Sequence, residues 1–167
     1  MLTTTIFPLI LIVATLLSAL VAGLLFTFAI VAMPGIKKLN DGEFIRAFQV
    51  IDGVIQNNQP LFMLVWVGSV VTMLTTAVLS FNQLSGAKLM LMIVATAVYL
   101  FGVQLPTALI NVPLNNQLQR IQVDQISEQA HKNARMDFEP RWNQWNRIRT
   151  VFASLASAML LVLLFAL

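Results

Sequence analysis

Four long apolar stretches divide the chain, and polar connections of unequal length separate them. The stretches cover about residues 6–33, 61–81, 87–110 and 148–167. Each is long enough to cross a hydrocarbon core, which takes roughly 20 apolar residues in a helix. Because a helix satisfies its own backbone groups in lipid, and because these runs lack the alternation of barrel strands, the pattern predicts four transmembrane helices.

The two long connections, over residues 34–59 and 111–147, also contain helical patterns. In the first, apolar residues recur at spacings of four, three and four: Phe44, Phe48, Ile51 and Ile55. Polar residues occupy the other side, which is typical of an amphipathic helix at a membrane interface. In the second, we expect a polar helix from Ser127 to Arg135. The connection over residues 82–86 is a tight turn.

Charge is distributed very unevenly. Of the ten Lys and Arg residues, nine lie in the two long connections or just past their ends: Lys37, Lys38, Arg46, Arg120, Lys132, Arg135, Arg141, Arg147 and Arg149. Only Lys88 lies on the other side. The positive-inside rule therefore predicts a multi-pass protein of the cytoplasmic (inner) membrane, with both long connections in the cytoplasm and both termini outside.

Composition agrees with this topology. Hydrophobic residues make up 58% of the 167 residues and charged residues only 10%, against about 25% charged in a soluble domain. The net charge of +3 follows from the loops, so we expect no nucleic-acid partner. The sequence predicts an all-α, integral membrane four-helix bundle with short amphipathic cytoplasmic helices, folded as a single domain over residues 1–167.

Several chemistries lack the residues they need. There is no cysteine for thiol chemistry, and the single histidine, His131, cannot provide bis-histidine haem ligation. A single histidine also cannot supply the two Glu-x-x-His motifs that a di-iron bundle needs. No carboxylate lies within any span, although small proton-coupled transporters need one there. We expect neither a metal nor a cofactor.

The densest group of candidate site residues opens the fourth span. Offsets of three, four and seven place Trp142, Trp145, Asn146 and Arg149 on one helix face. One interpretation is an interfacial belt that fixes the depth of the helix. The other is a binding site, because Arg149 would face the bundle just inside the membrane edge and would need a partner there.

Amides form the remaining candidates. Asn111 and Asn115 flank a proline where the third span ends, so Asn111 either caps the following helix or both amides line a pocket opposite Arg149. Gln104 is the only strongly polar side chain well inside a span, where it joins helices or lines the same pocket. Asn58 belongs to a polar run before the second span that forms a turn or borders the pocket.

Three of these segments together resemble the anthrone oxygenase-like family of membrane proteins. They are Met33-Pro34-Gly35, Asn111-x-Pro113-x-Asn115 and Trp142-x-x-Trp145-Asn146-x-x-Arg149. The family is named after enzymes that oxidise anthrones to anthraquinones. The resemblance implies four spans in matching positions and a site at Asn111, Asn115, Trp142, Asn146 and Arg149, with Trp145 in support.

Such an enzyme would be a cofactor-independent oxygenase acting on an apolar aromatic or quinone-type substrate. It needs an apolar slot, which Trp142 and Trp145 would provide, together with hydrogen-bond donors for a developing oxyanion and a base. His131 or Asp137 could act as the base only if the second connection folds back over the mouth of the bundle.

Two other functions remain open from the sequence. The protein could bind a lipid, a quinone or another apolar ligand without catalysis, or it could be a structural subunit that packs against a membrane partner. The expected partners are membrane lipid and an apolar small molecule, and a homo-oligomer is left open.

Overall fold

The computed structural model describes residues 2–167, with side chains from residue 6 onward, and this part of the chain contains helices and no strand. The elements are α1 (Leu2–Thr27), η1 (Phe28–Ala32), α2 (Met33–Ile36), α3 (Asp41–Gln56), α4 (Pro60–Gln83), α5 (Gly86–Tyr99), η2 (Leu100–Gln104), η3 (Thr107–Asn111), α6 (Val112–Gln119), η4 (Val123–Gln125) and α7 (Glu128–Ala166). Segments η1, η2 and η3 are π-helical, and η4 is a single 3₁₀ turn.

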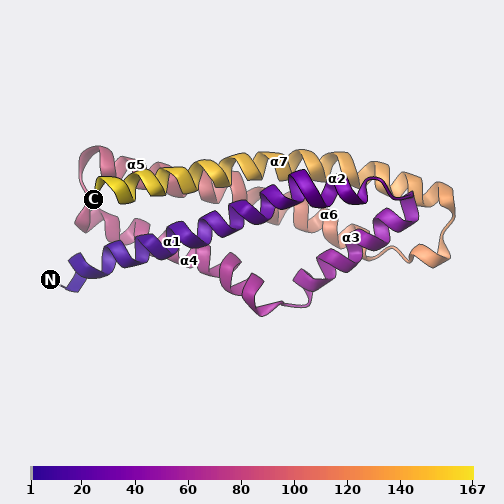
Figure 1. Ribbon diagram of the computed structural model, residues 1–167, viewed down its shortest axis with the longest axis horizontal. Helices are drawn as coiled ribbons and strands as arrows, with labels where there is room; N and C mark the ends of the chain where they lie inside the picture. Colours follow the sequence, from indigo (N-terminus) through magenta and orange to yellow (C-terminus); the bar gives the residue numbers. More distant parts are fainter. Residues whose placement is uncertain (1) are drawn as a thin grey trace.

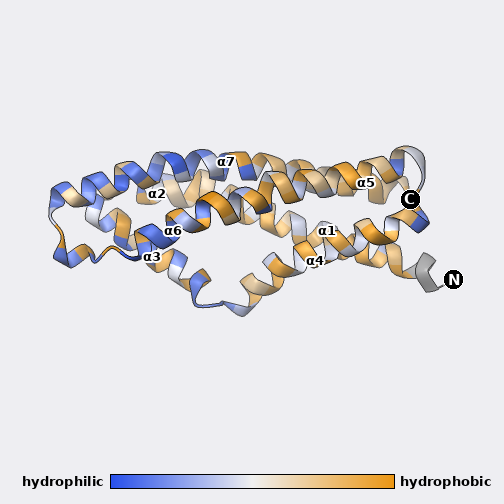
Figure 2. Ribbon diagram, turned by 180° about the vertical axis from the view of Figure 1, so that it is seen from behind, coloured by the Kyte–Doolittle hydropathy of each residue, from blue (hydrophilic) through white to orange (hydrophobic). Residues whose placement is uncertain are grey.

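The helices form an elongated bundle whose two chain ends lie at the same end (Figure 1). Four helical stretches are long and apolar enough to cross a membrane, over Ile6–Ile36, Pro60–Gln83, Gly86–Gln119 and Glu128–Ala166. The protein is therefore an all-α bundle of the multi-pass membrane type. Figure 2 shows one hydrophobic half, which contains both chain ends, and one hydrophilic half, which contains α3 and the first part of α7.

Two helices run further than the sequence indicates. The expected polar helix from Ser127 and the fourth span are one continuous helix, α7, in which Pro140 lies without ending it. The third span likewise continues through α6 to Gln119. The π-helical segment η3 follows Pro106 and precedes Pro113, and such wide turns accommodate backbone groups that proline leaves without a partner.

The amphipathic helix α3 begins at a complete capping box. The side chain of Asn40 accepts a hydrogen bond from the Glu43 backbone N–H at 2.9 Å, and the Glu43 carboxylate accepts one from the Asn40 N–H at 3.3 Å. Its buried apolar residues, Phe44, Ile45 and Phe48, pack with Phe138 and Trp142 of α7. This packing holds α3 against the polar half of α7.

Candidate functional site

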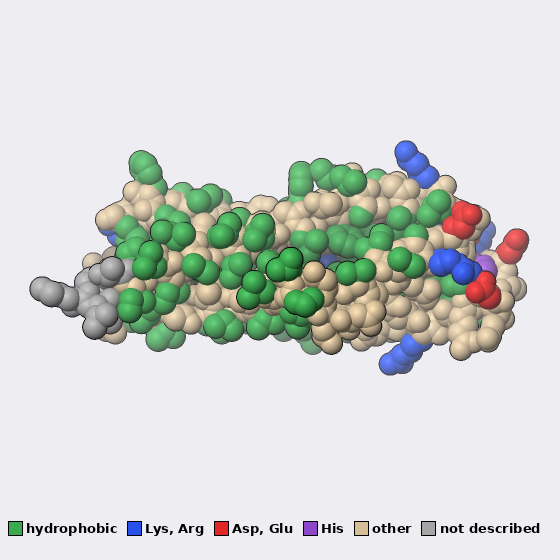
Figure 3. All heavy atoms as spheres, turned by 60° about the horizontal axis from the view of Figure 1, so that its bottom comes forward, with side chains coloured by type: hydrophobic (Ala, Val, Ile, Leu, Met, Phe, Trp, Pro, Cys, Tyr) green, Lys and Arg blue, Asp and Glu red, His purple; other side chains and the backbone are tan. Residues whose placement is uncertain are grey.

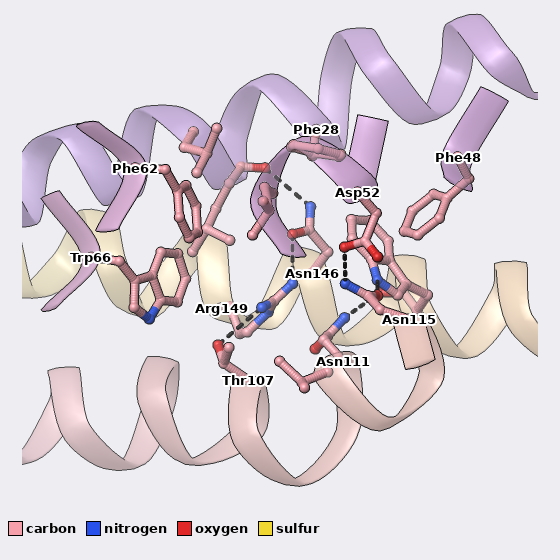
Figure 4. Close-up of a pocket in the computed structure, with 15 residues that line it drawn as sticks. Phe28, Phe48, Asp52, Phe62, Trp66, Thr107, Asn111, Asn115, Asn146 and Arg149 are labelled. Atoms are coloured by element: carbon pink, nitrogen blue, oxygen red, sulfur yellow. Dashed lines mark hydrogen bonds between the residues drawn. The ribbon is translucent and has the colours of Figure 1, made fainter. Parts of the chain in front are cut away.

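A cavity of about 240 Å³ lies where the polar and apolar halves of the bundle meet. The residues that line it come from α1, η1, α3, α4, η3, α6 and α7: Leu24, Leu25, Phe28, Phe48, Asp52, Ile55, Phe62, Trp66, Thr107, Asn111, Val112, Asn115, Trp142, Asn146 and Arg149 (Figure 4). Residues that lie far apart in the sequence thus meet at one site.

Aromatic side chains form much of the cavity wall. The Trp142 ring lies 5.7 Å from the Phe28 ring and 5.5 Å from the Phe48 ring, measured between centroids. The rings of Phe62 and Trp66 stack 5.5 Å apart with an interplanar angle of 19°. Flat, rigid walls of this kind suit a planar aromatic ligand.

The cavity reaches the surface on the side where α4 diverges from the end of the third span. Helix α4 packs along α1, whereas η3 and α6 pack against α7. Val112 borders the cavity and is 43% exposed. On one face of the molecule, basic atoms are visible between hydrophobic side chains, well away from the charged end (Figure 3). The cavity is therefore open to the surface beside Val112.

Arg149 is a buried cation without a counter-ion. Its side chain is 4% exposed, and in the described part of the chain no carboxylate lies within ion-pair distance of it. Its guanidinium donates to the Thr107 hydroxyl at 2.9 Å and to the Asn146 side-chain oxygen at 3.0 Å. Its Nε has no hydrogen-bond partner. Burying a charge without a paired charge is costly, so this cation is available for an anionic partner.

Two asparagines hold the helices around this cation. Asn146 donates to the backbone oxygen of Leu25 at 3.0 Å, which joins α7 to α1. Asn111 donates to the backbone oxygen of Trp142 at 3.3 Å, which joins η3 to α7. The side-chain oxygen of Asn111 is buried and has no partner. Asn111 is helical and makes no capping bond, so the expectation that it caps the following helix is wrong; the helix runs through it.

Asp52 is the site residue that the sequence reasoning missed. It is 3% exposed and borders the same cavity as Arg149. Its carboxylate accepts hydrogen bonds from the side-chain amides of Asn115 at 2.7 Å, Gln119 at 2.9 Å and Gln56 at 2.7 Å. A signal was present, because Asp52 continues the four-residue spacing of the two buried phenylalanines of α3, Phe44 and Phe48.

Asn115 connects the carboxylate to the aromatic wall. While its Nδ2 donates to Asp52, its Oδ1 accepts a hydrogen bond from the indole N–H of Trp142 at 2.7 Å. Figure 4 shows Asp52 and Asn115 on one side of Asn146, and Arg149 with Thr107 on the other. The cavity thus presents a fixed carboxylate and a fixed guanidinium that are not paired with each other.

The structure brings together five of the residues that the sequence singled out: Asn111, Asn115, Trp142, Asn146 and Arg149. Three others do not line the cavity. Trp145 is half-buried outside it, and the amide nitrogen of Gln104 is buried without a partner elsewhere in the bundle. Asn58 is exposed and takes a left-handed conformation, with φ 57°, in the turn between α3 and α4.

Neither residue considered as a base lies at the cavity. His131 forms a hydrogen bond to the backbone oxygen of Val123 at 2.8 Å, and Asp137 is exposed on α7. The second connection does not fold back over the bundle as that hypothesis required, because the polar helix extends the fourth span outward instead of reversing. Asp52 is the carboxylate that borders the cavity.

A family model described as anthrone oxygenase matches residues 62–159. This range contains the cavity residues of α4, η3, α6 and α7, and it excludes those of α1, η1 and α3, among them Asp52. No curated protein and no solved structure matches the chain.

Proposed function

The chain belongs to the anthrone oxygenase family, and from this premise we propose that it is a cofactor-independent oxygenase. Its substrate would be an apolar polyaromatic or quinone-type molecule that carries an acidic C–H bond. By the distribution of basic residues, the cavity would lie at the cytoplasmic end of the bundle in the inner membrane, with both chain termini outside.

One observation carries this proposal: Asp52 and Arg149 border one aromatic-walled cavity without forming an ion pair. Deprotonating a carbon acid requires a base near the C–H bond and a positive group near the oxygen that receives the charge. A carboxylate and a guanidinium that neutralised each other would serve neither purpose. Here amides hold Asp52, while a hydroxyl and an amide oxygen hold Arg149.

The reaction can be written so that atoms and electrons balance. The carboxylate of Asp52 takes one proton from the methylene carbon of an anthrone, and the charge moves to the carbonyl oxygen beside Arg149. The carbanion transfers an electron to dioxygen, and the two radicals combine into a C–O bond. The acid form of Asp52 returns its proton to the peroxide. Loss of the second C–H proton with hydroxide, as water, leaves the quinone, so CH₂ and O₂ give C=O and H₂O.

The size and walls of the cavity support a compact, flat substrate. Its volume of about 240 Å³ lies just below the roughly 300–1,000 Å³ of sites for drug-sized ligands. Trp142 and the stacked pair of Phe62 and Trp66 can contact the faces of fused rings. The buried, unpartnered oxygen of Asn111 is an acceptor for a substrate hydroxyl group.

The test is quinone formation by the purified full chain in lipid nanodiscs, with an anthrone under air. We expect quinone above the spontaneous rate, with one dioxygen consumed per quinone. Asp52→Asn removes the base while keeping the shape of the side chain, so the rate should fall by about 10²–10⁴-fold. Asp137→Asn, the same change on an exposed residue, should leave the rate unchanged.

Two outcomes would count against the proposal. If the wild-type chain forms no quinone above the rate of empty nanodiscs, it is no oxygenase for that substrate. If Asp52→Asn and the wild type form quinone equally fast, Asp52 is not the base. Binding of the anthrone without turnover would favour a non-catalytic ligand-binding protein.

A further inference from the structure

A basic furrow, defined by Lys37, Asn143 and Arg147, lies on the surface between α2 and α7. Two adjoining hollows share these three residues. The smaller hollow, of about 190 Å³, is also bordered by Ala29 and Met33 on the α1 side, toward the apolar half. None of these five residues lines the cavity described above, so the furrow is a separate feature of the molecule.

The two cations of the furrow have no carboxylate partner in the described part of the chain. Lys37 comes from the end of α2 and Arg147 from α7, so they approach the furrow from two different helices. Glu139 borders the wider hollow, but its carboxylate pairs with Arg135 at 2.8 Å. An anion in the furrow would therefore meet two uncompensated positive charges and the Asn143 amide.

The backbone beneath Lys37 is fixed in place. The guanidinium of Arg135 donates to the backbone oxygen of Lys37 at 2.8 Å and to that of Leu39 at 3.0 Å. It also pairs with Asp41 at 3.0 Å. These bonds attach the α2–α3 connection to α7. The distance between the backbones that carry Lys37 and Arg147 is thereby set before any ligand arrives.

Apolar side chains extend from the furrow toward the hydrophobic half. On the α1 side, Phe26 and Ile30 are 51% and 54% exposed. On α7, Val151 and Leu155 are 65% and 46% exposed and follow Arg147 at successive spacings of four residues. Residues four apart lie above one another on a helix. Helices α1 and α7 pack side by side, so exposed apolar side chains of both helices lead away from the two cations.

We propose that the basic furrow binds the phosphate headgroup of an anionic phospholipid, with an acyl chain along the exposed apolar side chains of α1 and α7. The observations specify both parts of such a molecule: two unpaired cations and an amide for the phosphate, and exposed apolar side chains for the chain. Cations near a membrane surface attract anionic lipid, and their apolar stems can lie along hydrocarbon while the charge remains at the headgroup level. A phosphate bound by both residues would link α2 to α7.

The experiment compares two double variants of the full chain by native mass spectrometry of lipid adducts. Lys37→Gln/Arg147→Gln removes the furrow cations. Lys38→Gln/Arg141→Gln is its matched control, because it makes the same change in charge at neighbouring exposed residues that do not border the furrow. Each protein is titrated with dioleoyl phosphatidylglycerol, with dioleoyl phosphatidylcholine and with inorganic phosphate. Circular dichroism and elution volume verify that both variants are folded.

We expect the wild type and the control to bind phosphatidylglycerol with the same affinity. The furrow variant should bind it about thirtyfold more weakly, or about fivefold for each cation removed. Phosphatidylcholine should bind all three proteins weakly and equally. Equal losses in the two variants would mean that only overall charge matters, and would overturn the proposal. Inorganic phosphate binding as tightly as the lipid would also overturn it, because the furrow would then be a site for a free anion.

Discussion

The cavity depends on a few polar side chains, and Arg149 is the most unusual of them. A buried cation without a counter-ion destabilises a fold, and replacing such a group with an apolar one is often neutral or stabilising. Residues of this kind are retained at functional sites despite their energetic cost. Arg149 can therefore be tested for function separately from structure.

We predict that Arg149→Met leaves the thermal stability of the protein nearly unchanged and removes activity. The methionine loses the bonds to Thr107 and Asn146 but also removes the desolvated charge. The free energy of unfolding should therefore change by no more than about 2 kcal/mol in either direction. Quinone formation should fall by about 10²–10³-fold, the usual effect of removing one group that stabilises an oxyanion.

Thermal unfolding in detergent and the anthrone assay together measure both quantities. Lys88→Met, the same apolar replacement of a cation outside the cavity, is the control for the loss of one charge. If Arg149→Met unfolds the protein, the guanidinium is a structural group. If it retains full activity, Arg149 has no part in the reaction.

At this scale the sequence predicted part of the cavity lining. The spacing of Trp142, Asn146 and Arg149 placed them on one face, and the structure confirms that they border one cavity. Asp52 was missed because it was assigned to the polar face of its helix. It lies at the edge of the apolar stripe, where amides from α6 reach it, which the pattern of a single helix cannot show.

Helices pack closely around Gly102, at the contact between η2 and α7. A Cβ atom at this position would lie 2.5 Å from Cγ of Phe152, which is far inside van der Waals contact. Only a glycine lets η2 approach α7 this closely. This contact lies on the side of the hydrophobic half where the third and fourth spans pack together.

We predict that Gly102→Ala destabilises the protein by about 1–3 kcal/mol, the usual cost of overpacking a filled interior. The matched control is Gly23→Ala in α1, where a Cβ would meet nothing within 4 Å. That change should be neutral or stabilising by up to about 1 kcal/mol, because alanine favours helix more than glycine does. Equal melting temperatures for the two variants would show that η2 and α7 are not packed this closely.

The existence of the helices was easier to predict than their limits. Apolar runs identify spans because lipid demands them, but no rule ends a helix when it leaves the membrane. Helix α7 begins after Ser127, whose side chain caps the first turn, and it continues through its polar half because Pro140 lies within it without ending it. A proline such as Pro113 either kinks a helix or starts a new one, and here the third span carries it after a π-helical turn.

The whole molecule combines two environments, and the cavity lies at their boundary. The apolar half is built from spans that the sequence predicts directly, while the polar half is stabilised by contacts such as those of Arg135 with the α2–α3 connection. A site at this level can receive an apolar ligand from lipid and exchange protons with water. We propose that a substrate in the cavity loses a proton from its methylene carbon and that Asp52 takes this proton.

Anaerobic exchange of deuterium into the methylene group of an anthrone tests that claim directly, because it isolates proton transfer from the reaction with dioxygen. The full chain in nanodiscs, in deuterated buffer without oxygen, should accelerate the loss of the methylene proton signal in NMR. Asp52→Asn should reduce the rate to that of empty nanodiscs. Exchange no faster than in empty nanodiscs, or equal exchange by the wild type and Asp52→Asn, would contradict the account.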